Sequence, residues 1–209
     1  MRSSGVRAAL AAALLVLAIA AAGLWWVAGR GFSTLDQPSA LEAFIAGRMR
    51  GLATPTAARS AVNPVAISDA TLADGMAHFA DHCANCHAND GSGNTPIGKG
   101  LYPKPPDMRQ PGTQNLTDGE LFYIIENGVM LTGMPGWSTG TIEGERASWE
   151  LVHFIRRLPT LTSDDLAEME KFNPVSRQQI EEERQIEDFL KGGDPPAPAA
   201  DPHAGHAKQ

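Results

Sequence analysis

The most apolar stretch of the chain runs from Ala8 to Ala28, where 20 of 21 residues are hydrophobic. A helix of that length spans roughly 31 Å, which is the thickness of a bilayer core. Arg2 and Arg7 precede the stretch, and under the positive-inside rule they keep the amino terminus in the cytoplasm and export the rest of the chain. We therefore expect residues 1–30 to form an N-terminal transmembrane anchor, with a cleaved signal peptide as the alternative.

The segment after the anchor, residues 31–67, is expected to be a tether with one short helix. Ser39 and Glu42 have the spacing of a capping box, in which each side chain bonds the backbone N–H of the other at a helix start. Apolar residues then recur at helical intervals, and we expect this stripe to pack on the chain's own domain. The stripe consists of Leu41, Phe44 or Ile45, Met49 and Leu52.

Three longer helices are expected within residues 68–160, which we interpret as the one compact domain. They cover residues 68–82, 117–128 and 143–158. Each carries apolar residues on one face, and the second starts at a further capping box formed by Thr117 and Glu120. Two loops separate the helices, residues 88–116 and 129–140, and both are rich in Gly, Pro and small polar residues. In a compact domain, a loop as long as residues 88–116 usually surrounds another group.

The chain becomes polar after the compact domain. Two helices with thin apolar stripes fit residues 161–192, so we expect a polar helical extension there, and a disordered tail rich in Pro and Ala over residues 193–209. His203 and His206 in this tail could bind copper, nickel or zinc weakly, although terminal histidines on a loose chain usually have no specific role. No segment reads as a convincing strand, and the expected fold class is therefore all-α.

Composition and charge narrow the function. The formal net charge is −7, which argues against a nucleic-acid partner because binding to phosphates requires a basic patch. The chain has two cysteines, which excludes both a scaffold of several disulfides and a zinc site built from four cysteines.

The two cysteines belong to a C-x-x-C-H motif that runs from Cys83 to His87. Two thiols at this spacing can reach the two vinyl groups on one edge of a porphyrin and form thioethers, which holds His87 under the iron as the proximal ligand. The predicted cofactor is one haem c, bound through Cys83 and Cys86. A zinc knuckle would need more ligands than His78 and His82 add, a thioredoxin-like site would need a βαβ unit, and a disulfide leaves His87 without a role.

An electron-carrying haem normally has a second axial ligand, for which a methionine thioether is a common choice. Met134 is the best candidate among the seven methionines, because it lies in a loop of small residues and proline that lets the backbone approach the ring. Met130 directly follows a helix end and is expected to serve in packing. We therefore expect His87 and Met134 to be the two ligands of the iron.

The second nitrogen of the His87 ring needs a partner that fixes the orientation of the ring. Pro105 and Pro106 follow in the long loop, and their carbonyl groups are not committed to a strand ladder. We expect the Pro106 carbonyl to accept this hydrogen bond, with Pro105 as the alternative.

A wider pattern surrounds these residues, in the segments Gly75–Phe79, Cys83–His87, Asp90–Gly93, Pro106–Met108, Asn127–Gly128, Gly133–Trp137 and Trp149–Leu158. The pattern resembles the class I cytochromes c, which occur as monohaem modules and as cytochrome subunits of bacterial haem–copper oxidases. The resemblance covers about residues 69–160. It implies His/Met coordination of one covalent haem and packing of Met108 against that haem. It also implies that Gly75 and Phe79 on the first helix cross the helix that carries Trp149.

An iron with both axial positions filled by protein exchanges one electron with little rearrangement and does not readily bind a substrate. The predicted function is one-electron transfer between redox protein partners, by a carrier that is not itself an enzyme. The anchor places it as a single-pass protein of the bacterial inner membrane, with its haem domain in the periplasm. The alternatives are a haem-containing subunit or assembly factor of a larger redox complex, and a ligand-binding or peroxidase-like haem protein with an open sixth position.

Overall fold

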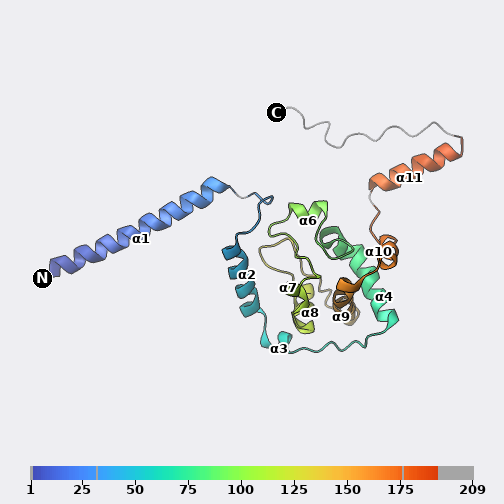
Figure 1. Ribbon diagram of the computed structural model, residues 1–209, viewed down its shortest axis with the longest axis horizontal. Helices are drawn as coiled ribbons and strands as arrows, with labels where there is room; N and C mark the ends of the chain where they lie inside the picture. The colour runs from blue at the N-terminus through green and yellow to red at the C-terminus, as the bar shows by residue number, and fades with distance from the viewer. Residues whose placement is uncertain (1, 32, 176, 193–209) are drawn as a thin grey trace.

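The computed structural model describes residues 2–31, 33–175 and 177–192, and every regular element within those ranges is a helix. The all-α fold class expected from the sequence is therefore confirmed. Helix α1 (Arg2–Arg30) projects away from the remainder of the molecule (Figure 1). Its stretch Gly5–Gly29 has a mean hydropathy of 2.4 and is long and apolar enough to cross a membrane. The prediction for His203 and His206 falls outside the described residues.

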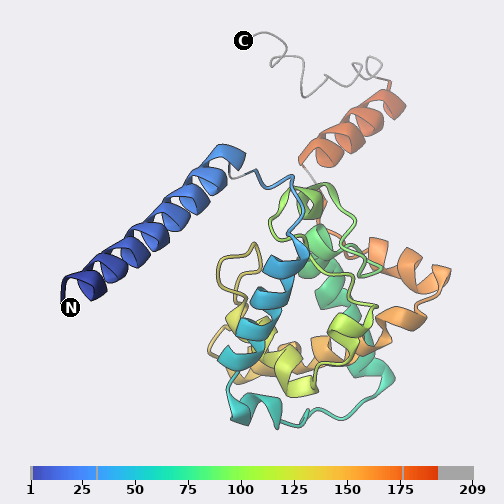
Figure 2. The same ribbon diagram turned by 60° about the vertical axis from the view of Figure 1, so that its left-hand side comes forward.

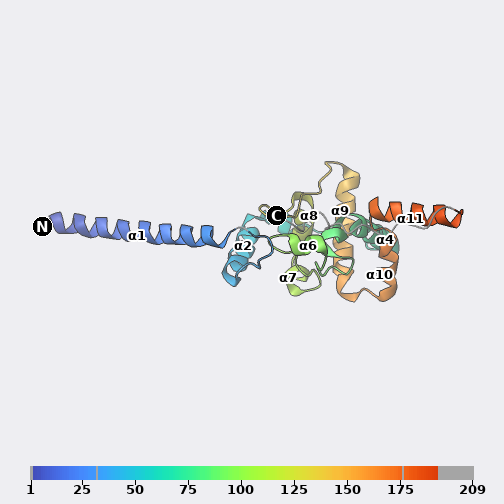
Figure 3. The same ribbon diagram turned by 90° about the horizontal axis from the view of Figure 1, so that it is seen from above.

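The other helices are short, and the longest of them lies at the centre of the domain. They are α2 (Ala40–Ala53), α3 (Thr56–Arg59), α4 (Asp69–His78), a π-helical turn (Phe79–Cys83), α5 (Ala84–His87), α6 (Pro96–Gly100), α7 (Pro111–Gln114), α8 (Asp118–Asn127), α9 (Ile142–Arg157), a 3-10 turn (Leu158–Thr160), α10 (Ser163–Glu170) and α11 (Arg177–Leu190). Viewed from above, α1 and α11 extend from opposite ends of the helical body (Figure 3).

Both capping boxes predicted from the sequence are formed. At the start of α2, Glu42 N donates to Ser39 Oγ at 3.3 Å, and Ser39 N donates to Glu42 Oε2 at 2.7 Å. Thr117 and Glu120 form the same pair of bonds at the start of α8, at 3.1 and 2.8 Å. These helix starts are set by residues three apart, which is why they could be read from the sequence.

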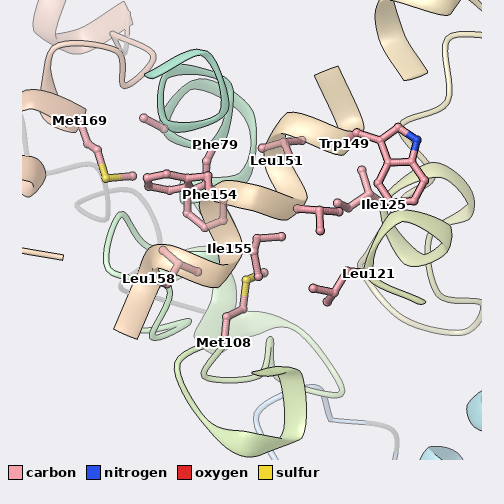
Figure 4. Packing of buried hydrophobic residues seen from close by; sticks show 12 residues of the cluster. Phe79, Met108, Leu121, Ile125, Trp149, Leu151, Phe154, Ile155, Leu158 and Met169 are labelled. Atoms are coloured by element: carbon pink, nitrogen blue, oxygen red, sulfur yellow. The ribbon is translucent and has the colours of Figure 1, made fainter. Parts of the chain in front are cut away.

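The crossing of α4 and α9 forms the centre of the core, as the family resemblance implied. A Cβ atom added at Gly75 would lie 2.5 Å from the backbone oxygen of Glu150, so only glycine permits this approach. Next to it, the rings of Phe79 and Phe154 lie 5.3 Å apart (Figure 4). Further along α9, Trp149 stacks on Phe122 of α8 at 4.0 Å, which attaches α8 to the same core.

The core continues beyond residue 160 into α10. Met169 is fully buried, and it lies beside Phe79 and Phe154 in Figure 4. Leu166, one turn earlier on the same helix, packs partly against the same cluster. A helix that looks polar in the sequence is thus held on the domain by two side chains.

The tether wraps around one side of the domain (Figure 2). Its later part is bonded to α9: the Asn63 side-chain amide donates to Trp149 O at 2.9 Å, and His153 Nε2 lies 2.7 Å from Val65 O. The earlier part, α2, has no buried residue. Its apolar side chains are exposed, so the prediction that this stripe packs on the chain's own domain is wrong.

Candidate cofactor site

The C-x-x-C-H motif lies where the backbone changes its helical pitch. The π-helical turn Phe79–Cys83 leads directly into α5, and Ala84 N donates to Phe79 O across the widened turn. Such π turns inside α-helical segments are frequent at functional sites. Both cysteines of the motif are half-buried and carry free thiols.

The environment of the two thiols does not suit thiol–disulfide exchange. Burial raises the pKa of Cys83 to about 12, with a smaller contribution from the nearby Cys86 thiol. Burial also raises the pKa of Cys86. Redox-active C-x-x-C cysteines have lowered pKa values, because the thiolate is the reactive form. The thioredoxin-like reading of the motif therefore has no support from this environment.

His87 is the buried imidazole of the motif, with 7% of its surface exposed. Burial lowers its pKa to about 4, so the ring is neutral near pH 7 and keeps a lone pair for a metal. Its Nδ1 atom is buried and has no hydrogen-bond partner among the residues that the structure describes. The predicted bond from His87 to the Pro106 carbonyl, or to that of Pro105, is therefore not formed. The Pro105 carbonyl oxygen lies close to Gly93, where an added Cβ would be 2.8 Å from it.

The backbone around His87 is fixed on both sides. His87 O accepts a 2.7 Å hydrogen bond from Gly93 N, and Ala88 N donates to Ala84 O at 2.8 Å. Ala88 itself has φ 61° and ψ 156°, a region that non-glycine residues adopt at a cost of roughly 1–3 kcal/mol. The fold therefore holds the peptide after His87 in one conformation.

The loop after His87 is closed by charged side chains. Arg109 donates to Asp90 Oδ2 at 2.9 Å and to both carboxylate oxygens of Asp107, at 2.8 and 2.9 Å. These hydrogen bonds hold the pKa of Asp107 down at about 2. Met108, between Asp107 and Arg109 in the chain, is buried, and its backbone N donates to Gly91 O at 2.8 Å. Its contact with a cofactor stays a prediction.

The loop that carries Met134 approaches the motif from the other side. Trp137 lies edge-on to His82, with ring centroids 5.5 Å apart, and His82 directly precedes Cys83. At Gly133 an added Cβ would be 2.7 Å from the Leu101 side chain. The residues on either side of Met134 thus contact the long loop and the turn before the motif. Met134 itself is half-buried.

Met130 does not pack, contrary to the prediction from the sequence. Thr132 N donates to Val129 O at 3.2 Å, which makes Met130 and Leu131 the two central residues of a tight turn. Residues at the tip of such a turn point into solvent, and Met130 is 87% exposed. Met134, whose N–H donates to the Thr132 hydroxyl at 3.1 Å, lies beyond this turn.

The available ligands fit a covalently bound haem better than they fit a bare metal ion. Among the described residues, no group of three or more His, Cys, Asp and Glu side chains could hold a metal, so the zinc-knuckle reading finds no site. Two free thiols, one neutral imidazole and one methionine are the groups that a haem c with His/Met ligation requires. The sequence analysis missed the contacts of Trp137 and Arg109. For Trp137, the one local indication of a place at the site is its position next to the Gly-Met-Pro sequence around Met134.

Comparison with known protein families finds a match for the central part of the chain. Residues 70–155 match the family described as cytochrome c oxidase, cbb3-type, subunit III. No curated protein matches the chain. The matched stretch contains nearly all of α4, the motif, Met134 and most of α9, whereas α1, α2, α10 and α11 lie outside it.

Proposed function

Since residues 70–155 are a cytochrome c domain similar to those of oxidase subunits, we propose that the chain is a membrane-anchored electron carrier with His/Met-ligated haem c. Such a domain indicates electron transfer by haem. The finer proposal concerns how this chain holds the haem and where it works: thioether bonds through Cys83 and Cys86, axial ligation by His87 and Met134, and a position outside the inner membrane.

Each of these residues suits its proposed role. The free thiols of Cys83 and Cys86 are in the spacing that two vinyl groups require. His87 is neutral and offers a ring nitrogen, and Met134 offers a neutral thioether. When bound, haem supplies an iron that alternates between its ferrous and ferric states. Two neutral ligands held by the protein keep exogenous molecules off the iron, and a thioether favours the reduced state.

The single observation that carries the proposal is the position of the Met134 loop. Gly133 contacts Leu101 and Trp137 contacts His82, so the loop is fixed against both the long loop and the turn that precedes the motif. A methionine on a loop that is fixed near the buried histidine motif supports a carrier with a closed iron and disfavours an enzyme with an open site.

The membrane part of the proposal rests on α1. The basic residues Arg2 and Arg7 lie at its start, and the helix then runs from Ala8 to Gly29 without a charged residue, a length that matches the thickness of a bilayer. Tethering would confine the haem domain to the membrane surface and raise its effective concentration for redox partners there.

The test is substitution of Met134 by Ala, with Met130→Ala as the matched control. Met134→Ala should keep covalent haem, lose the weak red-end absorption band of the oxidised protein and bind carbon monoxide when reduced. Met130→Ala should behave as wild type, because this side chain is exposed. If the reduced Met134→Ala protein excludes carbon monoxide as well as wild type does, Met134 is not the ligand.

A further inference from the structure

Helix α2 presents an apolar stripe that nothing in the described structure covers. The α2 stripe consists of Leu41, Phe44, Ile45, Met49 and Leu52, whose exposed fractions range from 47% to 83%. Contiguous exposed apolar side chains on a soluble surface mark a site of interaction with a protein or a membrane. We therefore expect a protein or a membrane to cover the α2 stripe.

The α2 helix is not a loose element whose exposure follows from detachment. Tyr102 Oη donates to Glu42 Oε1 at 3.3 Å near the start of α2. Just after its end, Arg59 donates to Thr54 O at 2.9 Å. In the connection before α2, Lys104 Nζ donates to Thr34 O at 2.6 Å. Both ends are thus bonded to neighbouring segments, while the side chains of the stripe stay exposed.

The position of α2 in the chain keeps it close to the membrane. Helix α1 ends at Arg30 and α2 begins at Ala40. The nine residues between them reach about 30 Å at most when fully extended. If α1 spans the bilayer, as proposed above, α2 cannot leave the neighbourhood of the headgroup layer.

The distribution of charge along the chain favours contact of the α2 region, and not of the rest of the domain, with an anionic membrane. Residues 30–60 contain four basic and two acidic residues, whereas residues 61–209 contain 11 basic and 22 acidic residues. Anionic lipid attracts the first part and repels the second. The Arg48 guanidinium lies over the Phe44 ring at 5.3 Å, so a cation borders the stripe. Basic residues beside aromatic and aliphatic ones are typical of helices that lie in the membrane interface.

An uncharged loop lies beside α2. No charged residue occurs between Glu126 and Glu143, and the loop in this interval lies next to α2 (Figures 1 and 2). Its tip exposes Met130 and Leu131 by 87% and 90%. The loop also carries Met134. An orientation that places the α2 stripe on lipid therefore turns the uncharged Met134 loop toward the membrane as well.

We propose that α2 is an interfacial helix whose stripe inserts into the outer headgroup layer of an anionic membrane. The inserted helix orients the haem domain, because its bonds to Tyr102 and to the segment after α2 fix the domain relative to it. The Met134 loop then faces the plane in which membrane-embedded redox proteins lie. The proposal rests on the membrane anchor proposed for α1.

The test uses the full-length holoprotein in nanodiscs of phosphatidylethanolamine and phosphatidylglycerol. Met49→Cys places a thiol on the stripe, and the control Ala43→Cys places one on the opposite side of α2. The native cysteines are occupied by haem, so a bimane label attaches to the introduced thiol. Brominated lipid should quench the label at position 49 at least twofold more than at position 43, and aqueous iodide should show the reverse order.

Two results would overturn the α2 proposal. Equal quenching by iodide at the two positions would place the stripe in water. Shielding of position 49 from both quenchers would mean that a protein, and not lipid, covers it.

Failure of the proposed function would be seen separately. Intact mass reports whether α1 and the covalent haem are present. If α1 proves to be cleaved, the anchor fails, and co-sedimentation of the processed protein with phosphatidylglycerol vesicles then decides for α2. Binding that is abolished by Phe44→Glu and Met49→Glu would support the interfacial helix, and an absence of wild-type binding would refute it.

Discussion

Arg109 is the residue that joins the two ends of the loop around the candidate haem site. It bonds Asp90, just after His87, and Asp107, on the far side of the loop. Its hydrogen bonds lower the pKa of Asp107 from an ordinary 3.8 to about 2. Because folding lowers this pKa, the carboxylate contributes stability above about pH 4 and loses that contribution as the pH falls toward 2.

Asp107→Asn should therefore reduce the free energy of unfolding at pH 6 by at most about 1 kcal/mol, since the pair is partly exposed to solvent. The difference from wild type should shrink below pH 4 and disappear near pH 2. Urea unfolding followed by circular dichroism at a series of pH values measures it. Asp74→Asn, which removes an exposed charge on α4, is the control. An Asp107→Asn deficit that stays constant from pH 6 to pH 2 would contradict the ion-pair explanation.

At the scale of elements, the crossing of α4 and α9 depends on Gly75. An added Cβ would meet the backbone of Glu150 at 2.5 Å, and backbone atoms cannot move aside cheaply. Gly75→Ala should destabilise the domain by about 1–3 kcal/mol, the usual cost of overpacking. Gly47→Ala in α2 is the matched control, because nothing lies within 4 Å of its Cβ, and it should be neutral or slightly stabilising. Equal unfolding midpoints for the two variants would refute the tight crossing.

Helix α10 provides a second prediction at this scale. Met169 is fully buried beside Phe79 and Phe154, so Met169→Ala should leave a cavity and cost about 2–5 kcal/mol. Met130→Ala makes the same chemical change at an exposed position and should cost little. Chemical unfolding of both variants measures the difference. A similarly small loss for both would mean that α10 is not part of the cooperative unit.

The elements also show which features sequence reasoning could predict. Helix starts and the cysteine motif could be read, because their chemistry needs residues three or four positions apart. The contact of Arg109 with Asp90 could not, since these residues are 19 positions apart and nothing local records their meeting. Periodicity identified the apolar side of α2 but not its surroundings. In the same way, the sequence shows that Met130 is apolar, but it does not show the turn that exposes this side chain.

At the scale of the whole molecule, the domain has a small core and a long loop rich in Gly and Pro. We expect such a domain to need its cofactor to fold, because ligand binding to the native state adds to its stability. Cys83→Ala with Cys86→Ala should abolish covalent haem, seen by intact mass, and also the cooperative thermal transition. Met134→Ala, which would leave the proposed thioether bonds in place, is the control and should keep the transition. Cooperative unfolding of the haem-free double variant would contradict the prediction.

The fixed peptide at Ala88 has a consequence for the speed of electron exchange. A carrier reacts fast when its ligands move little between the oxidised and reduced states, because the reorganisation energy is then small. Hydrogen bonds from Gly91 and Gly93 to the carbonyls of Ala88 and His87, together with the left-handed Ala88 backbone, leave the histidine few ways to shift. Under the ligation proposed for His87, this rigidity would keep the barrier to electron transfer low, at the cost of some strain in the Ala88 backbone.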